Sequence, residues 1–145
     1  VGVGIDISAE ALKIAEENGQ NLKITDRVEW RQGDYLKAFD EEDIFDGIFS
    51  NPPYIPTKDI GGLSREVKHE PRLALDGGTD GLYFYHLLAK GAAEHLKPGG
   101  FLAVEFGIGQ ATDILEMFRK SAQYEDFEVI KDYGGIERAL YCRKK

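Results

Sequence analysis

The chain has 145 residues, a single cysteine and a formal net charge of −8 at pH 7. This length is typical of one domain, so we expect a single domain over residues 1–145, and the negative charge argues against a protein that binds nucleic acid by neutralising its phosphates. The lone Cys142 excludes an intrachain disulfide and a cysteine-based metal cluster, which fits a reducing cytoplasm. No apolar run reaches the roughly 18 residues of a membrane span. We therefore expect a cytoplasmic protein that does not enter a membrane.

An apolar stretch at the start of the chain leads into an acidic side chain. Residues 1–5 are valine, isoleucine and glycine, and Asp6 follows them, which predicts a short parallel strand with a carboxylate at its C-terminal edge. A helix is predicted next, because Ser8 can cap it and apolar residues recur at helical spacing as far as Leu22. In nucleoside-binding α/β folds such a carboxylate accepts hydrogen bonds from ribose hydroxyls. The alternative is that Asp6 only helps to cap the helix.

A second short strand is predicted over residues 28–31, and Gly33-Asp34-Tyr35 follows it. A Gly-Asp pair by itself is common in turns. At the end of a strand, however, Asp34 can accept a hydrogen bond from an adenine amino group while Tyr35 covers the ring. These three residues are therefore a candidate base-binding segment.

The third predicted strand, residues 44–50, runs into Asn51-Pro52-Pro53-Tyr54. Ligands of open α/β sheets bind at the C-terminal ends of strands, and two prolines make the chain leave the sheet stiffly. The Asn51 side chain and the Pro52 carbonyl offer two acceptors beside the flat ring of Tyr54, an arrangement that suits a planar NH2 group. Holding such a group toward a methyl donor would promote its methylation by positioning. The alternative is a stiff turn without chemistry.

Residues 55–81 are predicted to form a long glycine-rich loop, and loops of this length in compact domains are usually functional or disordered. The loop carries the main basic cluster of the chain, Arg65, Lys68, His69 and Arg72. A role in contacting substrate and a merely solvated loop are both open.

The remainder of the chain completes an α/β pattern. We predict a helix over residues 82–96, a turn at Lys97-Pro98-Gly99-Gly100, a strand over 101–106, a helix over 110–122, and two closing strands over 127–131 and 139–143. The short connection between the last two strands permits an antiparallel pair.

Several of these segments together resemble the protein-(glutamine-N5) methyltransferases of the HemK/PrmC type. The resemblance runs nearly from end to end and rests on Asp6, Gly33-Asp34-Tyr35, Asn51-Pro52-Pro53-Tyr54, His69-Glu70-Pro71, the stretch Gly77-Gly78-Thr79-Asp80-Gly81-Leu82, and Lys97-Pro98-Gly99-Gly100. Asn-Pro-Pro-Tyr is shared with other enzymes that methylate amino groups, whereas the Glu-Pro and Gly-Gly-x-Asp-Gly loop points to the glutamine branch.

The resemblance implies a class I S-adenosylmethionine-dependent methyltransferase fold, a Rossmann-like α/β fold with a mostly parallel sheet and an antiparallel C-terminal hairpin. It implies S-adenosylmethionine as cofactor and no metal. The implied substrate is a peptide-chain release factor, methylated on the glutamine of its Gly-Gly-Gln motif. The implied cofactor residues are Asp6 for the ribose, Asp34 and Tyr35 for the adenine, and Asn51. The implied catalytic and substrate-binding residues are Asn51, Pro52, Pro53 and Tyr54, with Glu70 also contacting substrate.

The chain departs from that family at its beginning. The family has a first strand and a glycine-rich cofactor loop before the acidic residue, whereas Gly2 and Gly4 here lie inside the strand that ends at Asp6. We therefore expect these 145 residues alone to bind S-adenosylmethionine more weakly than the intact fold, and we expect a preceding segment to supply the strand between those ending at Asp6 and Asn51. Two rival interpretations are a nucleic-acid adenine N6 or other amino-methyltransferase, which would use the same acceptors on a flipped base, and an inactive fragment that acts as a binding module.

Overall fold

The computed structural model describes residues 1–64 and 69–145, so Arg65 and Lys68 of the basic cluster lie outside the described residues. The chain divides into two compact units, Val1–Asp43 and Ile44–Lys145, which we call unit 1 and unit 2. The strands of the described residues form two sheets, one in each unit. The strand that ends at Asp6 and the strand that leads into Asn51 therefore belong to different sheets.

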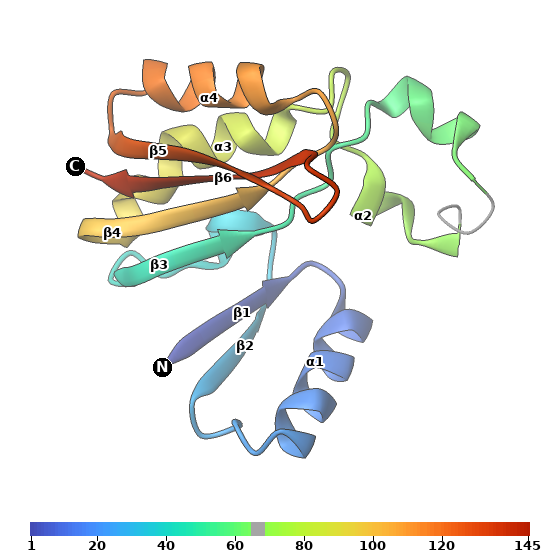
Figure 1. Cartoon of the computed structure of the whole chain (residues 1–145). Helices are drawn as coiled ribbons and strands as arrows, with labels where there is room; N and C mark the ends of the chain where they lie inside the picture. Colours follow the sequence, from blue (N-terminus) through green and yellow to red (C-terminus); the bar gives the residue numbers. More distant parts are fainter. Residues whose placement is uncertain (65–68) are drawn as a thin grey trace. The chain divides into compact units, whose positions relative to one another are not determined.

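Unit 1 is a strand–helix–strand unit followed by a short 3-10 helix. Its elements are β1 (Gly2–Asp6), α1 (Ala9–Asn21), β2 (Val28–Gln32) and η1 (Tyr35–Ala38). The two strands are parallel and α1 lies beside them (Figure 1). Helix α1 begins as predicted, because the Ser8 hydroxyl accepts a hydrogen bond of 3.2 Å from the Ala11 amide. The predicted order of strand, acidic residue, helix and strand is confirmed.

The indole of Trp30 explains the glycine within the first strand. A Cβ atom added to Gly4 would lie 2.4 Å from the Trp30 ring, and one added to Gly19 on α1 would lie 3.5 Å from it. The ring thus occupies the space that a larger residue at position 4 would need. Gly4 is a packing residue of β1, which agrees with the interpretation that Gly2 and Gly4 do not form a cofactor loop.

Unit 2 holds a four-stranded sheet with helices over one face. The elements of this layer are β3 (Phe45–Ser50), α3 (Tyr83–Gly91), η4 (Ala92–His95), β4 (Leu96–Glu105), α4 (Ala111–Lys120), β5 (Tyr124–Lys131) and β6 (Glu137–Lys144). The strand order is β3-β4-β6-β5, in which β3 and β4 are parallel while β6 is antiparallel to both β4 and β5. Helices α3 and α4 cover one face (Figure 1). The predicted change from parallel pairing to an antiparallel hairpin is confirmed.

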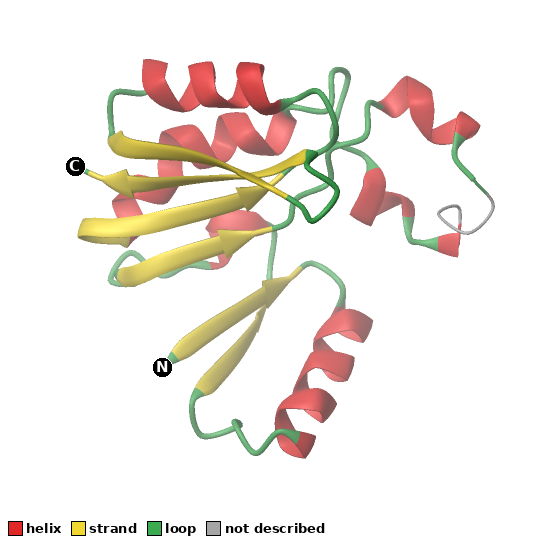
Figure 2. Ribbon diagram, viewed as in Figure 1, coloured by secondary structure: helices red, strands yellow, loops and turns green. Residues whose placement is uncertain are grey.

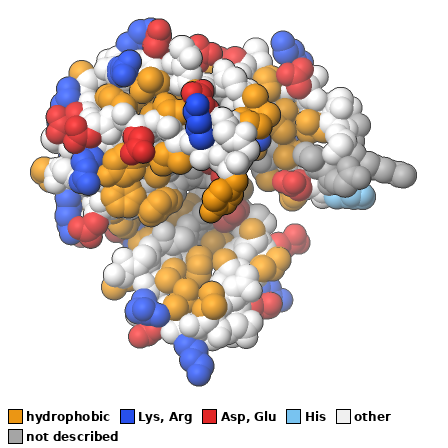
Figure 3. Space-filling model, viewed as in Figure 1, with side chains coloured by type: hydrophobic (Ala, Val, Ile, Leu, Met, Phe, Trp, Pro, Cys, Tyr) orange, Lys and Arg blue, Asp and Glu red, His pale blue; other side chains and the backbone are white. Residues whose placement is uncertain are grey.

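The two faces of this sheet differ in burial. Leu102, Val104 and Leu140 are at most 1% exposed and form the core with side chains of the covering helices. Alternate residues point to the other face, where Phe49 is 78% exposed and meets Phe101 edge-on, with ring centroids 5.1 Å apart. Figure 3 shows hydrophobic side chains gathered on the face of the sheet that the two helices do not cover. The apolar core of unit 2 therefore lies between the sheet and the two helices.

The largest differences from the predicted element boundaries lie between residues 82 and 101. The helix predicted over residues 82–96 is divided into α3 and the 3-10 helix η4, and β4 begins at Leu96 rather than at Phe101. Leu96 pairs with Phe45, and the register shifts between that pair and the next one. The predicted turn at residues 97–100 is therefore the first part of β4, held in the sheet by a pairing that local sequence does not reveal.

The segment predicted as a loop over residues 55–81 contains short helical turns. They are η2 (Thr57–Gly62) and α2 (Arg72–Leu75), which Figure 2 shows beyond the C-terminal end of β3. Ile55 and Asp76 form an isolated parallel bridge between the two ends of the segment. The prediction of a long loop was therefore wrong in part, because the described residues of the segment include short helical turns and a backbone bridge.

Candidate active site

The first predicted group of site residues lies at one edge of the sheet of unit 1. Asp6 and Gln32 are opposite each other at the C-terminal ends of β1 and β2. The Asp6 carbonyl accepts a hydrogen bond of 3.1 Å from the Gly33 amide, which brings Asp6 next to the start of Gly33-Asp34-Tyr35. The predicted ribose-binding and base-binding residues therefore share one strand edge.

The Asp6 carboxylate takes part in a local turn and is also exposed. Its Oδ1 atom accepts a hydrogen bond of 2.8 Å from the Ser8 amide, just before α1 begins. The residue as a whole is exposed. Asp6 therefore has the local turn role that the sequence left open, and its exposed carboxylate is also an anionic acceptor at the strand edge.

Asp34 and Tyr35 occupy a tight turn. The Asp34 carboxylate forms an ion pair of 2.5 Å with Lys37, and about half of its side chain is exposed. Tyr35 has φ +60°, a left-handed conformation that is uncommon outside glycine and that often marks functional sites. A Cβ atom added to Gly33 would lie 2.4 Å from the Cβ of Ala38, so only glycine fits at the start of this turn.

The second predicted group, Asn51-Pro52-Pro53-Tyr54, follows the end of β3 in unit 2. Asn51 is exposed, Pro52 is buried, and Pro53 and Tyr54 are half-buried. The prolines fix φ and lack N–H groups, so positions 52 and 53 are stiff and donate no backbone hydrogen bonds. The segment is therefore anchored at Pro52 and leaves the side chain of Asn51 accessible.

The segment that precedes α3 lies against Tyr54. The Gly77 amide donates a hydrogen bond of 2.9 Å to the Ile55 carbonyl, and the Ile55 amide donates one of 3.1 Å to the Leu75 carbonyl. A Cβ atom added to Gly77 would lie 2.8 Å from the Tyr54 Cα and 2.9 Å from the Pro53 oxygen. The glycines of this segment thus allow two backbones to approach closely, which the sequence did not indicate.

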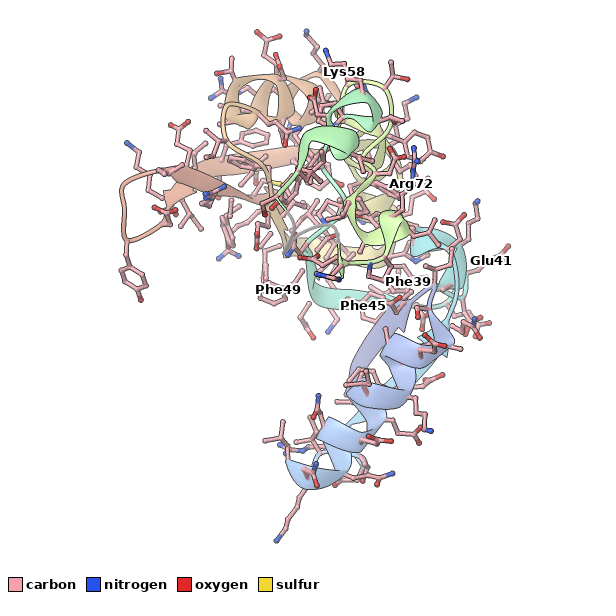
Figure 4. The ribbon with its side chains drawn as sticks, turned by 90° about the vertical axis from the view of Figure 1, so that its right-hand side faces the viewer. Phe39, Glu41, Phe45, Phe49, Lys58 and Arg72 are labelled. Atoms are coloured by element: carbon pink, nitrogen blue, oxygen red, sulfur yellow. The ribbon has the colours of Figure 1, made fainter. Side chains whose placement is uncertain are left out.

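Glu70, the predicted substrate contact in the same region, is exposed and stands just before Pro71, the N-cap residue of α2. Figure 4 places Lys58 on η2 and Arg72 on α2, the two short helical segments that follow Tyr54. His69 is also exposed. A role of Glu70, His69 and Arg72 in substrate contact stays a prediction.

Asp76 fastens the same segment through its carboxylate. Its Oδ1 atom accepts hydrogen bonds of 2.6 Å from the Thr57 hydroxyl and 3.1 Å from the Gly78 amide. These bonds, the one from Thr57 first, lower the pKa of Asp76 from its ordinary value of 3.8, and Arg72 contributes a weaker effect. Asp76 is therefore an anchor that the sequence did not single out.

The lowered pKa of Asp76 predicts an acid-sensitive anchor. A carboxyl with a lowered pKa in the folded state stabilises that state above its ordinary pKa and loses this contribution as the pH falls through the lowered value. We expect the protection of the Gly78 amide hydrogen, measured by NMR as its exchange rate relative to that of an unstructured peptide, to fall over that acidic range in the wild type. The Asp76→Asn variant keeps an acceptor but cannot titrate, so it should lack this step. An equal step in both proteins would contradict the assignment.

Gln110 is the other site residue that sequence reasoning missed. The sequence indicated only that a helix begins near it, whereas its side-chain amide bonds both Tyr54 and Gly81, at distances of 3.1 and 3.3 Å. The one local signal is its place three residues after Gly107 at the end of a strand.

Among the described residues, no group of three or more His, Cys, Asp and Glu side chains is placed to hold a metal ion, and no helix is long and apolar enough to cross a membrane.

Comparison with known proteins agrees with this geometry. The fold is that of the class I methyltransferases: the chain aligns over 98% of its length with a methyltransferase from Pyrococcus furiosus, with a TM-score of 0.70, 24% identity and 61% of that chain covered. It also aligns over 99% of its length with an O-methyltransferase from Bacillus cereus in complex with SAH, with a TM-score of 0.60, 14% identity and 62% of that chain covered. Residues 2–105 match the family model described as a methyltransferase domain. The chain belongs to this methyltransferase domain family.

The curated relatives are more specific in name and longer in sequence. A release factor glutamine methyltransferase from Moorella thermoacetica is 42% identical over 140 residues, which is 97% of this chain and 49% of the relative. The chain thus spans about half the length of the curated relatives it matches. The family resemblance deduced from the sequence is confirmed.

Proposed function

We propose that this chain forms the catalytic part of an S-adenosylmethionine-dependent methyltransferase that methylates the side-chain amide nitrogen of a glutamine in a peptide-chain release factor. Two findings support the proposal. The chain belongs to a methyltransferase domain family, and the relatives it resembles at 42–45% identity carry the name release factor glutamine methyltransferase. The Gly-Gly-Gln motif of the release factor is the target implied by the resemblance.

The proposal rests on one observation: in the segment after β3, an exposed polar side chain stands on a backbone that is held in place. The side chain of Asn51 is exposed, while the next residue is buried and Tyr54 is held by a hydrogen bond to its carbonyl and by close backbone contacts. An acceptor on a rigid strand end is preorganised to bind the same group in the same orientation each time. The proposed substrate group is a primary amide, which has two N–H donors in one plane.

The residues of this segment act by orienting the amide. The Asn51 side-chain oxygen and the Pro52 carbonyl accept the two N–H hydrogens, and the ring of Tyr54 packs against the amide plane. When bound, S-adenosylmethionine would supply an electrophilic methyl group to the amide nitrogen, with the sulfur leaving as a neutral thioether and the displaced amide proton passing to water. The residues of this chain would hold and orient the amide, so they need no general base and contribute mainly by positioning.

The residues of unit 1 fit the nucleoside part of that cofactor. Asp6 presents an exposed carboxylate at the strand edge, and the Gly33 amide bonded to its carbonyl brings Asp34 and Tyr35 to the same edge. Carboxylate oxygens suit ribose hydroxyls and an adenine amino group, and a tyrosine ring suits the face of a base. We assign Asp6 to the ribose and Asp34 with Tyr35 to the adenine.

The Asp6 assignment predicts weaker cofactor binding in a variant. Asp6→Ala should raise the Kd of the native protein for S-adenosylmethionine by about 10- to 100-fold, because hydrogen bonds to a charged group contribute roughly 1.5–3 kcal/mol. Isothermal titration calorimetry measures this change. Asp6→Asn keeps an acceptor for the Ser8 amide and should show a smaller loss. Asp26→Ala, which removes a carboxylate that is 81% exposed in the same unit, should have no effect. An unchanged Kd in Asp6→Ala would restrict Asp6 to its local turn.

The proposed function is tested by methyl transfer from radiolabelled S-adenosylmethionine. The native protein is incubated with a folded release factor, with the same factor carrying asparagine in place of the motif glutamine, and with DNA or RNA. We expect label only in the factor that contains the glutamine. Label in nucleic acid and none in the release factor would favour the rival amino-methyltransferase, and label in neither would favour a binding module.

A further inference from the structure

Gln110 joins three backbone segments that are far apart in the sequence. Its Oε1 atom accepts a hydrogen bond of 2.8 Å from the Gly107 amide, in the turn between β4 and α4. Its Nε2 atom donates to the carbonyl of Tyr54, 56 residues away, and to the carbonyl of Gly81, 29 residues away. Gln110 is the N-cap residue of α4, yet its side chain makes no capping hydrogen bond. Its side-chain amide therefore forms hydrogen bonds with the three segments instead of capping the helix.

The same three segments are in close contact around Tyr54. A Cβ atom added to Gly107 would lie 2.9 Å from the Tyr54 ring and 3.0 Å from the Gln110 Oε1 atom. Gly81 has φ +78°, and a Cβ atom added there would lie 2.4 Å from the Tyr54 carbonyl oxygen. Tyr54 is therefore held at its carbonyl by Gln110 and at its ring by the backbone of Gly107.

A primary amide is the side-chain group that this arrangement requires. It needs one acceptor for the Gly107 amide and two N–H donors for two carbonyl oxygens, and glutamine supplies all three. Glutamate at this position would keep the acceptor and lose both donors, which would leave the Tyr54 carbonyl facing another oxygen. The prolines at 52 and 53 cannot anchor the segment through N–H groups of their own. Gln110 therefore fixes the Tyr54 carbonyl, in addition to the backbone hydrogen bonds that hold the neighbouring Ile55.

We propose that Gln110 is the positioning residue of the methyl-acceptor site: by fixing the Tyr54 carbonyl, it holds Asn51-Pro52-Pro53-Tyr54 in the geometry that orients the substrate amide. This inference rests on the proposed function. Gln110 acts through Tyr54 and is not itself assigned a contact with the reacting atoms. A displacement of about 1 Å at such a site can lower the rate about 100-fold.

The test compares Gln110→Ala and Gln110→Glu with the wild type in the native protein, using S-adenosylmethionine and a release factor. We expect kcat to fall by about 100-fold in both variants, while KM for S-adenosylmethionine stays within about threefold. Gln123→Ala is the matched control, because the Gln123 amide also donates to two backbone carbonyls of unit 2, those of Ala89 and Lys90. This control should retain the wild-type kcat.

The outcomes separate this inference from the proposed function. Circular dichroism and thermal melting give the folded fraction of each variant, and kcat is expressed per folded molecule. A kcat within threefold of wild type in Gln110→Ala, or an equal loss in Gln123→Ala, overturns the positioning role while the proposed function stands. A rise in KM for S-adenosylmethionine that matches the fall in kcat also overturns it. A wild-type protein that transfers no methyl group overturns the proposed function and this inference with it.

Discussion

Replacing Asn51 by alanine is expected to lower the rate of methyl transfer by the native protein by about 100- to 1,000-fold, equivalent to about 2.7–4 kcal/mol of transition-state stabilisation. The reason is that the Asn51 oxygen holds one N–H of the substrate amide, so its loss frees the nitrogen to rotate away from the methyl donor. Asn51 is exposed, and truncating it should not unfold unit 2. Single-turnover kinetics with saturating cofactor measures the effect on the chemical step.

The control for this prediction is another exposed asparagine. Asn21 is the last residue of α1 and is also exposed, so Asn21→Ala should leave the rate unchanged. The Kd for S-adenosylmethionine should change much less in Asn51→Ala than in Asp6→Ala, because Asn51 is assigned mainly to the substrate amide. A variant at Asn51 with near-normal turnover would reduce the segment to a stiff turn.

The ends of the strands could be predicted because the residues that mark them are adjacent in the sequence. A mainly apolar run that stops at a polar residue marks both the end of a strand and the group presented there, which is why Asp6 and Asn51 could be placed at the ends of their strands. The N-cap at Ser8 was found for the same reason, since the hydroxyl and the amide it bonds are three residues apart.

The contacts that were missed are distant in the sequence. The hydrogen bond of Gln110 to Tyr54 spans 56 residues, and the pairing of Leu96 with Phe45 spans 51. Neither has a periodic pattern in the residues around it. Gly4 is similar, because the Trp30 ring that excludes a larger side chain there belongs to another strand. The sequence thus predicted which groups the strand ends present and not how those groups are held.

The second large effect concerns stability. Phe118 on α4 is 0% exposed and lies against Tyr124 on β5, with ring centroids 5.3 Å apart. Phe118→Ala removes a ring from the layer between helix and sheet, where the loss of buried apolar surface and the cavity left behind together cost about 3–5 kcal/mol of unfolding free energy. Urea unfolding followed by far-UV circular dichroism measures this change.

Phe49→Ala is the matched control, because Phe49 is in the same unit and 78% exposed, and it should lower the free energy of unfolding by less than about 1 kcal/mol.

The single tryptophan, Trp30, lies in unit 1. Its fluorescence therefore follows the unfolding of that unit, whereas exchange of amide hydrogens in β4 and β6 follows the unfolding of unit 2. A loss in Phe118→Ala no larger than the loss in Phe49→Ala would mean that the contacts between α4 and the sheet do not stabilise unit 2. The anchor that Gln110, at the start of α4, provides for Tyr54 would then lack a stable support.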